Sequence, residues 1–386
     1  MSLDLMDMER RLIGFDTVSR NSNLPLIEYL AGILKPMGLD VQTFTSPDGK
    51  KANLFATLGP KDKGGLMLAG HTDTVPVEGQ AWDTNPFALT EQGGKFFGRG
   101  TADMKSFIVQ SVLAAEAVKG RKLKVPLHLA FTYDEEVGCH GAALLMKHLA
   151  KQKMVLPASA VIGEPTNFQV FNKHKGFSAC RVSIRGVEGH SSKPPRGANA
   201  IQQAAKIIDK LMEVEAERKT HRSFESEFEL PYTTVNVGMI SGGTATNIIP
   251  NRCDLHFEYR TMPGEDPAYV LNQLQGYVKE VLLPAFLKQQ PNVSIEVVEE
   301  NRGLPMQCPP GAEIEALALE LTGQSRTSAA PYYTEGAIYN ESGIPTVVCG
   351  PGDIDQAHRP NEFITREQLN MGVPFLGRLI ERVCLT

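Results

Sequence analysis

The sequence predicts an α/β protein that carries an inserted α+β segment, and three observations lead to this prediction. Short apolar runs bounded by polar loops alternate with stretches of helical period towards both ends of the chain. The middle of the chain instead follows a β-α-β-β-α-β order. The 386 residues exceed the usual domain size of about 150, and 42% of them are apolar, so the chain can form two substantial cores.

Four buried strands are expected in the α/β part. Each is a short and nearly continuous apolar run, which is typical of a strand that is covered on both faces. A helix is expected from Met104 to Val118, because apolar residues recur there at helical spacing and Gly120 follows as a stop. The expected strands are residues 65–70, 127–133, 158–163 and 345–349.

The middle of the chain has its own order of elements. Strands are expected over 177–184, 233–240, 252–260 and 293–298, and helices over 199–216 and 267–287. This order is the split-βαβ, or ferredoxin-like, arrangement, in which two helices back a four-stranded sheet. The α/β character returns after about residue 301. We therefore expect a larger domain of residues 1–175 and 301–386, with residues 176–300 inserted in it.

Acidic residues and histidines follow the expected strands where each strand ends. The carboxyl ends of strands in an open α/β sheet meet at one edge, so these side chains are expected to form one cluster. Two imidazoles and at least three carboxylates suit a pair of divalent metals that activate a water molecule. This combination indicates a metallohydrolase. The residues are His71, Asp103, Glu135, Glu136, Glu164 and His358.

The charges of such a site support the same interpretation. Two Zn²⁺ ions are balanced by three carboxylates and one bridging hydroxide, so the buried site would be nearly neutral. One histidine and one terminal carboxylate per metal, with a shared carboxylate and a shared water, complete the four ligands that zinc prefers. Asp73 follows His71 by two positions and is expected to hold the second imidazole nitrogen. A single residue of this set would more often be a loop residue or a helix cap, so the prediction depends on the whole set.

Four segments resemble the di-zinc amidohydrolase family of aminoacylases, succinyl-diaminopimelate desuccinylase and acetylornithine deacetylase. The resemblance covers essentially the whole chain and implies an open, mixed-sheet catalytic domain with an inserted lid and dimerisation domain. The family usually has Gly where this chain has Ser106, at the expected helix start. The segments are 70–76 (GHTDTVP), 98–105 (GRGTADMK), 132–136 (TYDEE) and 163–165 (GEP).

The family's site residues transfer to matching positions. The resemblance assigns His71 and Glu164 to one metal, Glu136 and His358 to the other, Asp103 as the bridging ligand, and Glu135 as the general base. The implied reaction is hydrolysis of an amide, in which Glu135 takes a proton from the activated water and returns it to the leaving nitrogen. The ligands are carboxylates and imidazoles without thiolate, so Zn²⁺, Co²⁺ and Mn²⁺ all suit the site.

Further roles are implied for the inserted segment. Residues 186–192 resemble the family segment whose histidine stabilises the oxyanion, often from the partner subunit, and this assigns His190 to that role. Asn247, in a Gly-rich turn, and Arg260, after a strand, match positions that approach the substrate. A guanidinium suits a substrate carboxylate. A homodimer is expected, because His190 would act across subunits and the small domain offers an exposed edge.

The resemblance is greater to the acetylornithine deacetylases than to other branches of the family, through residues 162–167, 174–176 and 350–362. It implies an N²-acyl-L-amino acid substrate, with N²-acetyl-L-ornithine of arginine biosynthesis as the first choice. Residues 332–336 also resemble that branch, and Glu335 is a candidate partner of the ornithine amine. The alternatives are a desuccinylase, an aminoacylase, a metal-dependent carboxypeptidase or dipeptidase, and a metal-binding homologue without turnover. The presence of Glu135 argues against the last.

Composition excludes several classes of partner. The net charge is -5, and no long Lys/Arg cluster occurs, which argues against nucleic acids and anionic membranes. The sequence has no apolar run of membrane-spanning length and no signal-peptide pattern at its start. Its six cysteines are widely spaced without a Cys-x-x-Cys motif, as expected for reduced thiols in a cytoplasmic protein. Among them, Cys139 lies close enough to Glu136 in sequence to affect the site.

Overall fold

The computed structural model describes residues 3–220 and 227–385 and has the predicted mixed α/β fold with a second, smaller sheet. The chain divides into two compact units, each described here by itself. The large unit contains residues 1–173, 306–328 and 334–386, and the inserted unit contains residues 174–305 and 329–333. The sequence pattern did not separate residues 329–333 from the large unit. The roles of residues 1–175 and 301–386 as a catalytic domain, and of residues 176–300 as a lid and dimerisation domain, remain predictions.

The large unit is built on a mixed sheet of nine strands in the order β1-β2-β6-β3-β7-β17-β8-β15, with β16 paired to β8. Strands β3, β6, β7 and β17 run parallel to their neighbours in this group, whereas β1 and β2 are antiparallel additions. The strands are β1 (Asp40–Thr45), β2 (Ala52–Leu58), β3 (Leu66–His71), β6 (Leu127–Thr132), β7 (Ser159–Pro165), β8 (Phe171–His174), β15 (Met306–Gln307), β16 (Ser328–Ala330) and β17 (Thr346–Gly350).

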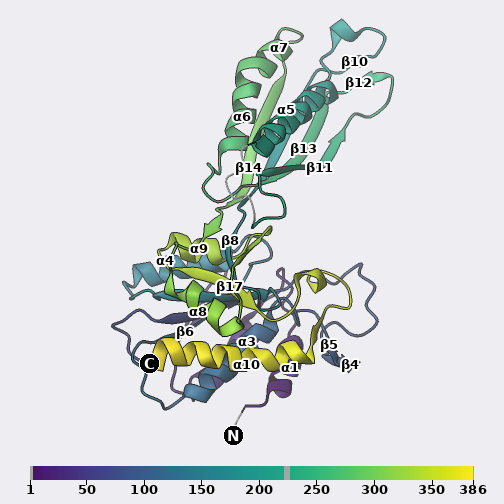
Figure 1. The fold of residues 1–386 in the computed structure, drawn as a ribbon. Helices are drawn as coiled ribbons and strands as arrows, with labels where there is room; N and C mark the ends of the chain where they lie inside the picture. Colours follow the sequence, from purple (N-terminus) through teal and green to yellow (C-terminus); the bar gives the residue numbers. More distant parts are fainter. Residues whose placement is uncertain (1–2, 221–226, 386) are drawn as a thin grey trace. The chain divides into compact units, whose positions relative to one another are not determined.

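Helices cover both faces of this sheet. Figure 1 shows α1, α3 and α10 below it and α4 and α9 above it. Every residue of β3, β6 and β17 is buried, which explains why most residues of these strands are apolar. The helices are α1 (Leu5–Ile13), α2 (Leu24–Leu34), α3 (Lys105–Val118), α4 (His140–Lys151), α8 (Glu313–Thr322), α9 (Gly336–Glu341) and α10 (Arg366–Ile380).

A small antiparallel sheet in the order β18-β5-β4 completes the large unit. Its strands are β4 (Thr90–Gln92), β5 (Lys95–Phe97) and β18 (Phe363–Thr365). Strands β5 and β18 pair directly, so they hold the segment before Asp103 beside the segment after His358. All four strands predicted from the apolar runs are confirmed as β3, β6, β7 and β17, and the predicted helix is α3.

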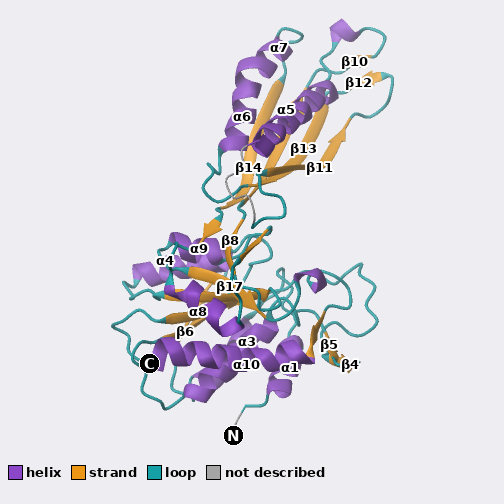
Figure 2. Cartoon of the chain, in the orientation of Figure 1, coloured by secondary structure: helices purple, strands orange, loops and turns teal. Residues whose placement is uncertain are grey.

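The inserted unit is an antiparallel sheet in the order β11-β13-β9-β14, with α5 and α6 packed over it (Figure 2). Its β-α-β-β-α-β order confirms the split-βαβ prediction. Strand β14 extends beyond the predicted end at residue 298, and the second predicted helix contains a π-helical segment, Val278–Leu282. The elements are β9 (Phe177–Arg185), α5 (Ala200–Thr220), β11 (Thr234–Gly242), β13 (Arg252–Arg260), α6 (Tyr269–Tyr277), α7 (Leu283–Leu287) and β14 (Ser294–Gly303).

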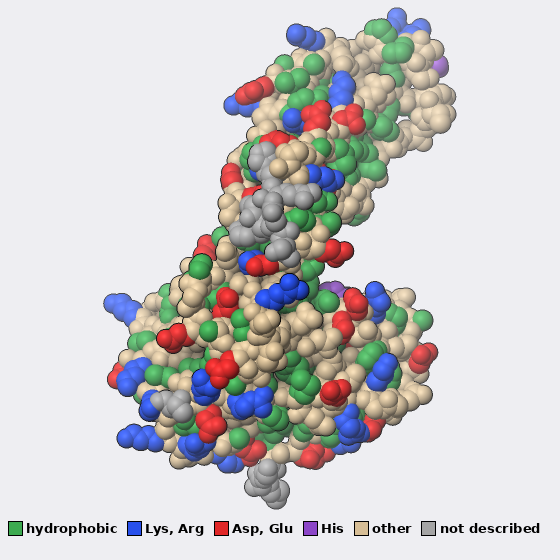
Figure 3. Space-filling model, in the orientation of Figure 1, with side chains coloured by type: hydrophobic (Ala, Val, Ile, Leu, Met, Phe, Trp, Pro, Cys, Tyr) green, Lys and Arg blue, Asp and Glu red, His purple; other side chains and the backbone are tan. Residues whose placement is uncertain are grey.

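Three further properties bear on function. No helix within the described residues is both long and apolar enough to cross a membrane. All six cysteines are free and buried. The visible face of the large unit carries acidic and basic side chains interspersed with each other (Figure 3).

Candidate metal centre

The carboxyl ends of the parallel strands place the predicted ligands at one edge of the large sheet. His71 is the last residue of β3, Glu164 lies near the end of β7, and Glu136 follows β6. The loop after β17 supplies His358, and Asp103 lies two residues before α3 begins. Neighbouring parallel strands end together, and residues that are far apart in sequence therefore meet in space.

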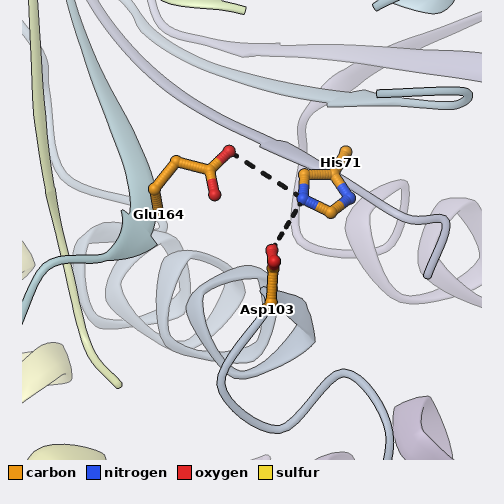
Figure 4. Close-up of side chains that lie close together, drawn as sticks. All are labelled: His71, Asp103 and Glu164. Atoms are coloured by element: carbon orange, nitrogen blue, oxygen red, sulfur yellow. Dashed lines mark hydrogen bonds and ion pairs between the residues drawn. The ribbon is translucent and has the colours of Figure 1, made fainter. Parts of the chain in front are cut away.

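The first group of ligands is His71, Asp103 and Glu164, whose ligand atoms all lie within 4.8 Å of one another. The three side chains converge in Figure 4. The Nε2 atom of His71 lies 2.9 Å from Oδ1 of Asp103 and 3.8 Å from Oε1 of Glu164. The His71 side chain is only 1% exposed, so this group lies in the protein interior.

The second group is Asp103, Glu136 and His358. The Nε2 atom of His358 lies 2.9 Å from Oε2 of Glu136 and 3.3 Å from Oδ2 of Asp103. Each oxygen of Asp103 therefore faces a different histidine. This is the arrangement that a bridging carboxylate requires.

The electrostatics of the cluster are those of carboxylates crowded in a buried place. Burial, and secondarily the charge of Asp103, raise the pKa of Glu136 to about 7 and that of Glu164 well above its usual value. Burial opposes ionisation of Asp103, but hydrogen bonds from His358 and His71 lower its pKa below the ordinary range. Hydrogen bonds to Asp103 and Glu136 raise the pKa of His358 to about 11. The cluster thus attracts positive charge.

The donor set fits a pair of divalent cations. Asp103, Glu136 and Glu164 offer three carboxylates beside two imidazoles, and oxygen and nitrogen ligands without thiolate suit such metals. Within the described part of the chain, the buried Oε1 atom of Glu164 has no hydrogen-bond partner. A buried carboxylate oxygen without a partner is costly, and a metal ion would satisfy it.

Asp73 lies beside the second nitrogen of His71, as expected, but the closer atom is in its main chain. The Nδ1 atom of His71 is 3.0 Å from the Asp73 carbonyl oxygen and 3.6 Å from its carboxylate. That carboxylate instead accepts hydrogen bonds from the backbone N–H groups of Glu135 and Glu136, at 3.1 and 3.3 Å, and from Ser19. Asp73 therefore links the histidine at the end of β3 to the glutamate pair after β6.

Glu135 adjoins the cluster without belonging to either group of three. Burial raises its pKa well above the ordinary value, the charge on His71 lowers it, and the neighbouring carboxylates raise it further. The thiol of Cys139 lies 3.5 Å from Oε1 of Glu135. The sequence suggested that Cys139 could affect the site, and this contact identifies Glu135 as the group that it touches.

Glu335 is fully buried beside α9 in the large unit. Its two carboxylate oxygens accept hydrogen bonds from Thr132 and, at 3.2 Å, from Tyr339. Burial raises the pKa of Glu335 to about 7. These contacts occupy both oxygens within the core, so the predicted pairing of Glu335 with a substrate amine remains a prediction.

The three other predicted residues belong to the inserted unit. His190 is in β10 (Gly189–His190), which pairs with β12 (Ile248–Ile249), and the backbone N–H of Ser191 donates to the Asn247 carbonyl at 3.0 Å. His190 and Asn247 are therefore neighbours, beside a cavity of about 690 Å³ that Ser191 and Thr246 help to line. Arg260 ends β13, whereas Asn247 precedes that strand. The guanidinium of Arg260 donates two hydrogen bonds to the carboxylate of Glu258, at 3.2 and 3.3 Å.

The sequence interpretation missed a buried carboxylate next to the cluster. Glu362 accepts backbone hydrogen bonds from the segment that contains Asp103 and pairs with Arg99. The available signal was a pair of opposite charges in segments otherwise expected to be buried, one in residues 98–103 and one after His358. Charged side chains of that kind are seldom buried without a partner.

Comparisons with known proteins agree with this fold. Residues 67–382 match the family model for peptidase family M20/M25/M40. An acetylornithine deacetylase from Klebsiella pneumoniae (strain 342) is 36% identical over 387 residues, covering 98% of this chain and 97% of that protein. One from Proteus mirabilis (strain HI4320) is 36% identical over 388 residues, with the same coverage.

Solved structures share the fold at low identity. The aminopeptidase PepT from Bacillus cereus has a TM-score of 0.75 at 20% identity, covering 98% of this chain and 97% of its own. A metallo-carboxypeptidase from Sulfolobus solfataricus has a TM-score of 0.76 at 18% identity, covering 98% and 99%. A Bacillus subtilis protein described as a dinuclear metal-binding peptidase has a TM-score of 0.71 at 16% identity, covering 97% and 96%.

Proposed function

The chain belongs to peptidase family M20/M25/M40 and is a metal-dependent hydrolase, and we propose that it cleaves N²-acetyl-L-ornithine to L-ornithine and acetate. The observation that carries this substrate is the 36% identity, over 98% of the chain, to two proteins that are named acetylornithine deacetylases. The reaction would place the enzyme in arginine biosynthesis.

We propose that two Zn²⁺ ions are the native cofactors, with Co²⁺ and Mn²⁺ as substitutes that the same ligands admit. His71 and Glu164 would hold one ion, Glu136 and His358 the other, and Asp103 both. The separation of the two Asp103 oxygens towards the two histidines supports this assignment. When bound, the metals would acidify a water molecule and polarise the amide carbonyl.

Glu135 is proposed as the general base and acid. Its raised pKa suits a carboxylate that accepts a proton from water and then donates it to the leaving nitrogen. Asp73 would assist by position, because its carboxylate holds the backbone of Glu135 while its carbonyl faces Nδ1 of His71. The base and one ligand are therefore oriented by the same residue.

The inserted unit is proposed to contribute His190 to the oxyanion and Asn247 and Arg260 to substrate binding. The close approach of the Asn247 and His190 segments supports joint action of the first two. We further propose a homodimer in which His190 acts across subunits. Mixing inactive His190→Ala with inactive Glu135→Ala protein tests this. Activity returns if the histidine acts on the partner's site, and verified subunit exchange without recovery contradicts it.

A small-molecule substrate is consistent with an amidohydrolase. The interspersed surface charges in Figure 3 differ from the basic patch that a polyanion-binding protein presents, so we propose no nucleic-acid partner and no membrane partner. The free, buried cysteines support a reducing compartment, and we propose the cytoplasm.

The test of substrate is steady-state hydrolysis by the zinc-reconstituted enzyme, with a chelated control. The four substrates are N²-acetyl-L-ornithine, N-acetyl-L-methionine, N-succinyl-L,L-diaminopimelate and a dipeptide. We expect kcat/KM for acetylornithine to exceed the others at least about tenfold and to vanish on chelation. Preference for another substrate would identify an aminoacylase, a desuccinylase or a peptidase. Metal binding without turnover of any of them would indicate a non-catalytic homologue.

A further inference from the structure

Glu362 is a buried carboxylate that holds the segment carrying Asp103. Its Oε1 atom accepts hydrogen bonds from three backbone N–H groups, those of Gly100, Ala102 and Asp103, at 3.1, 2.8 and 3.0 Å. The Glu362 carbonyl oxygen also accepts from the N–H of Gly98 at 3.0 Å. One residue thus fixes the backbone that leads up to, and includes, a predicted bridging ligand.

The other carboxylate oxygen connects to the loop of the second histidine. Oε2 of Glu362 accepts from Nη1 of Arg99 at 2.6 Å, and Nη2 of Arg99 donates to Oε1 of Gln80 at 2.6 Å. Nε2 of Gln80 in turn donates to the His358 carbonyl at 2.9 Å. Trp82 lies 5.1 Å from the guanidinium carbon and donates to the same Gln80 oxygen at 3.1 Å.

Glu362 follows His358 in the same loop, so this chain of hydrogen bonds starts and ends in that loop. We call the closed chain from Glu362 through Arg99 and Gln80 to His358 the circuit. His358 and Asn361 have φ angles of +63° and +58°, a region that non-glycine residues adopt only where their surroundings hold them. Asn361 is held by two hydrogen bonds of 2.9 Å with Asp83. The Gln80 and Glu362 bonds add further constraints on this loop.

We propose that Glu362 is a positioning residue that locks the Asp103 segment to the His358 loop, so that both metal sites form together. This proposal rests on the ligand set proposed above. A bridging ligand contributes to two sites, so displacement of Asp103 weakens both, and displacement of the His358 loop weakens one of them further. The Glu362 side chain is fully buried and that of Arg99 is 1% exposed, which limits competition from water for this circuit.

The first test variant is Glu362→Gln, whose carbonyl oxygen can still accept from the backbone but which loses the charge opposite Arg99. A lone buried guanidinium can prevent folding, so the double variant Glu362→Gln with Arg99→Met removes both charges. Glu9→Gln is the matched control. Glu9 is another fully buried glutamate of the large unit, and its carboxyl is hydrogen-bonded to Ser106, which is not a predicted ligand.

Metal-free protein is titrated with Co²⁺, and its calorimetric affinity and visible absorption are recorded together with the fluorescence of Trp82, the single tryptophan of the chain. We expect both Glu362 variants to bind Co²⁺ about 10-fold to 100-fold more weakly, with an altered absorption spectrum. With acetylornithine at saturating metal, kcat should fall while KM changes less than about threefold. Glu9→Gln should match the unaltered enzyme in all of these measurements.

Unaltered Co²⁺ affinity and spectrum in a folded Glu362 variant would overturn the proposal, even if the variant melts at a lower temperature, because a purely structural role predicts only the latter. If the unaltered protein itself fails to bind two equivalents of Co²⁺, the ligand set is wrong and this proposal is wrong with it. Normal metal binding by the unaltered protein without turnover of acetylornithine refutes only the proposed substrate.

Discussion

Glu9 provides a quantitative prediction about stability, because it is a fully buried carboxyl in the core of the large unit. The hydroxyl of Ser106 lies 3.0 Å from Oε2 of Glu9 and 2.7 Å from the carbonyl oxygen of Thr101. The hydroxyl has one proton to donate, and both of these oxygens accept it. The shared proton therefore stabilises an ionised Glu9 only weakly, and burial makes the native state favour the neutral carboxyl.

The magnitude follows from the pKa. Burial raises the pKa of Glu9 from 4.5 to about 8, and the hydrogen bond from Ser106 lowers it by less. Between these values the native protein keeps a proton that the unfolded chain has released. The free energy of unfolding therefore falls as pH rises, by about 1.4 kcal/mol per pH unit and at most about 5 kcal/mol in all. Glu9→Gln removes this dependence.

The assay is urea unfolding of the chelator-treated protein at several pH values between 5 and 8, followed by far-UV circular dichroism. The other carboxylates titrate alike in both proteins, so the difference in unfolding free energy isolates Glu9. Relative to the unaltered protein, Glu9→Gln should become more stable by several kcal/mol on going from pH 5 to pH 8. Glu320→Gln, at an exposed position paired with Arg382, is the control and should show no such trend. A difference that stays constant across this range refutes the reasoning.

Four further outcomes are expected. Glu135→Gln should lower kcat by about 10²-fold to 10⁴-fold with metal content unchanged, and near-normal turnover would exclude it as the general base. Asp103→Ala should lose both metals by elemental analysis, whereas Glu164→Ala should lose mainly one; equal losses contradict the bridging role. Asp73→Ala should reduce kcat/KM about 10-fold to 100-fold, and an unaffected enzyme would assign the orienting role to the backbone alone. Glu335→Gln should reduce the preference for acetylornithine over acetylleucine, and unchanged selectivity would contradict the predicted pairing of Glu335 with the ornithine amine.

Local pattern was sufficient for much of the fold. The apolar runs before His71 and Glu136 correspond to β3 and β6, since a strand covered on both faces consists mostly of apolar residues. The alternation of 252–260 corresponds to β13, because one face of that strand is buried and the other is not. The end of β14 was placed too early, at residue 298, because its last residues are charged or small.

For the candidate site, too, local sequence pattern predicted one part and tertiary packing decided the other. The sequence by itself determined that His71, Glu136 and Glu164 reach one edge of the large sheet, because the end of a strand is a local property and parallel strands end on the same side. Only the tertiary structure decided how they meet: that the two oxygens of Asp103 face different histidines, and that the Asp73 carboxylate holds the backbone of Glu135. It also decided that Glu362 anchors Asp103, 259 positions away. Contacts of this kind depend on how loops pack against each other, and no periodicity along the chain encodes that packing.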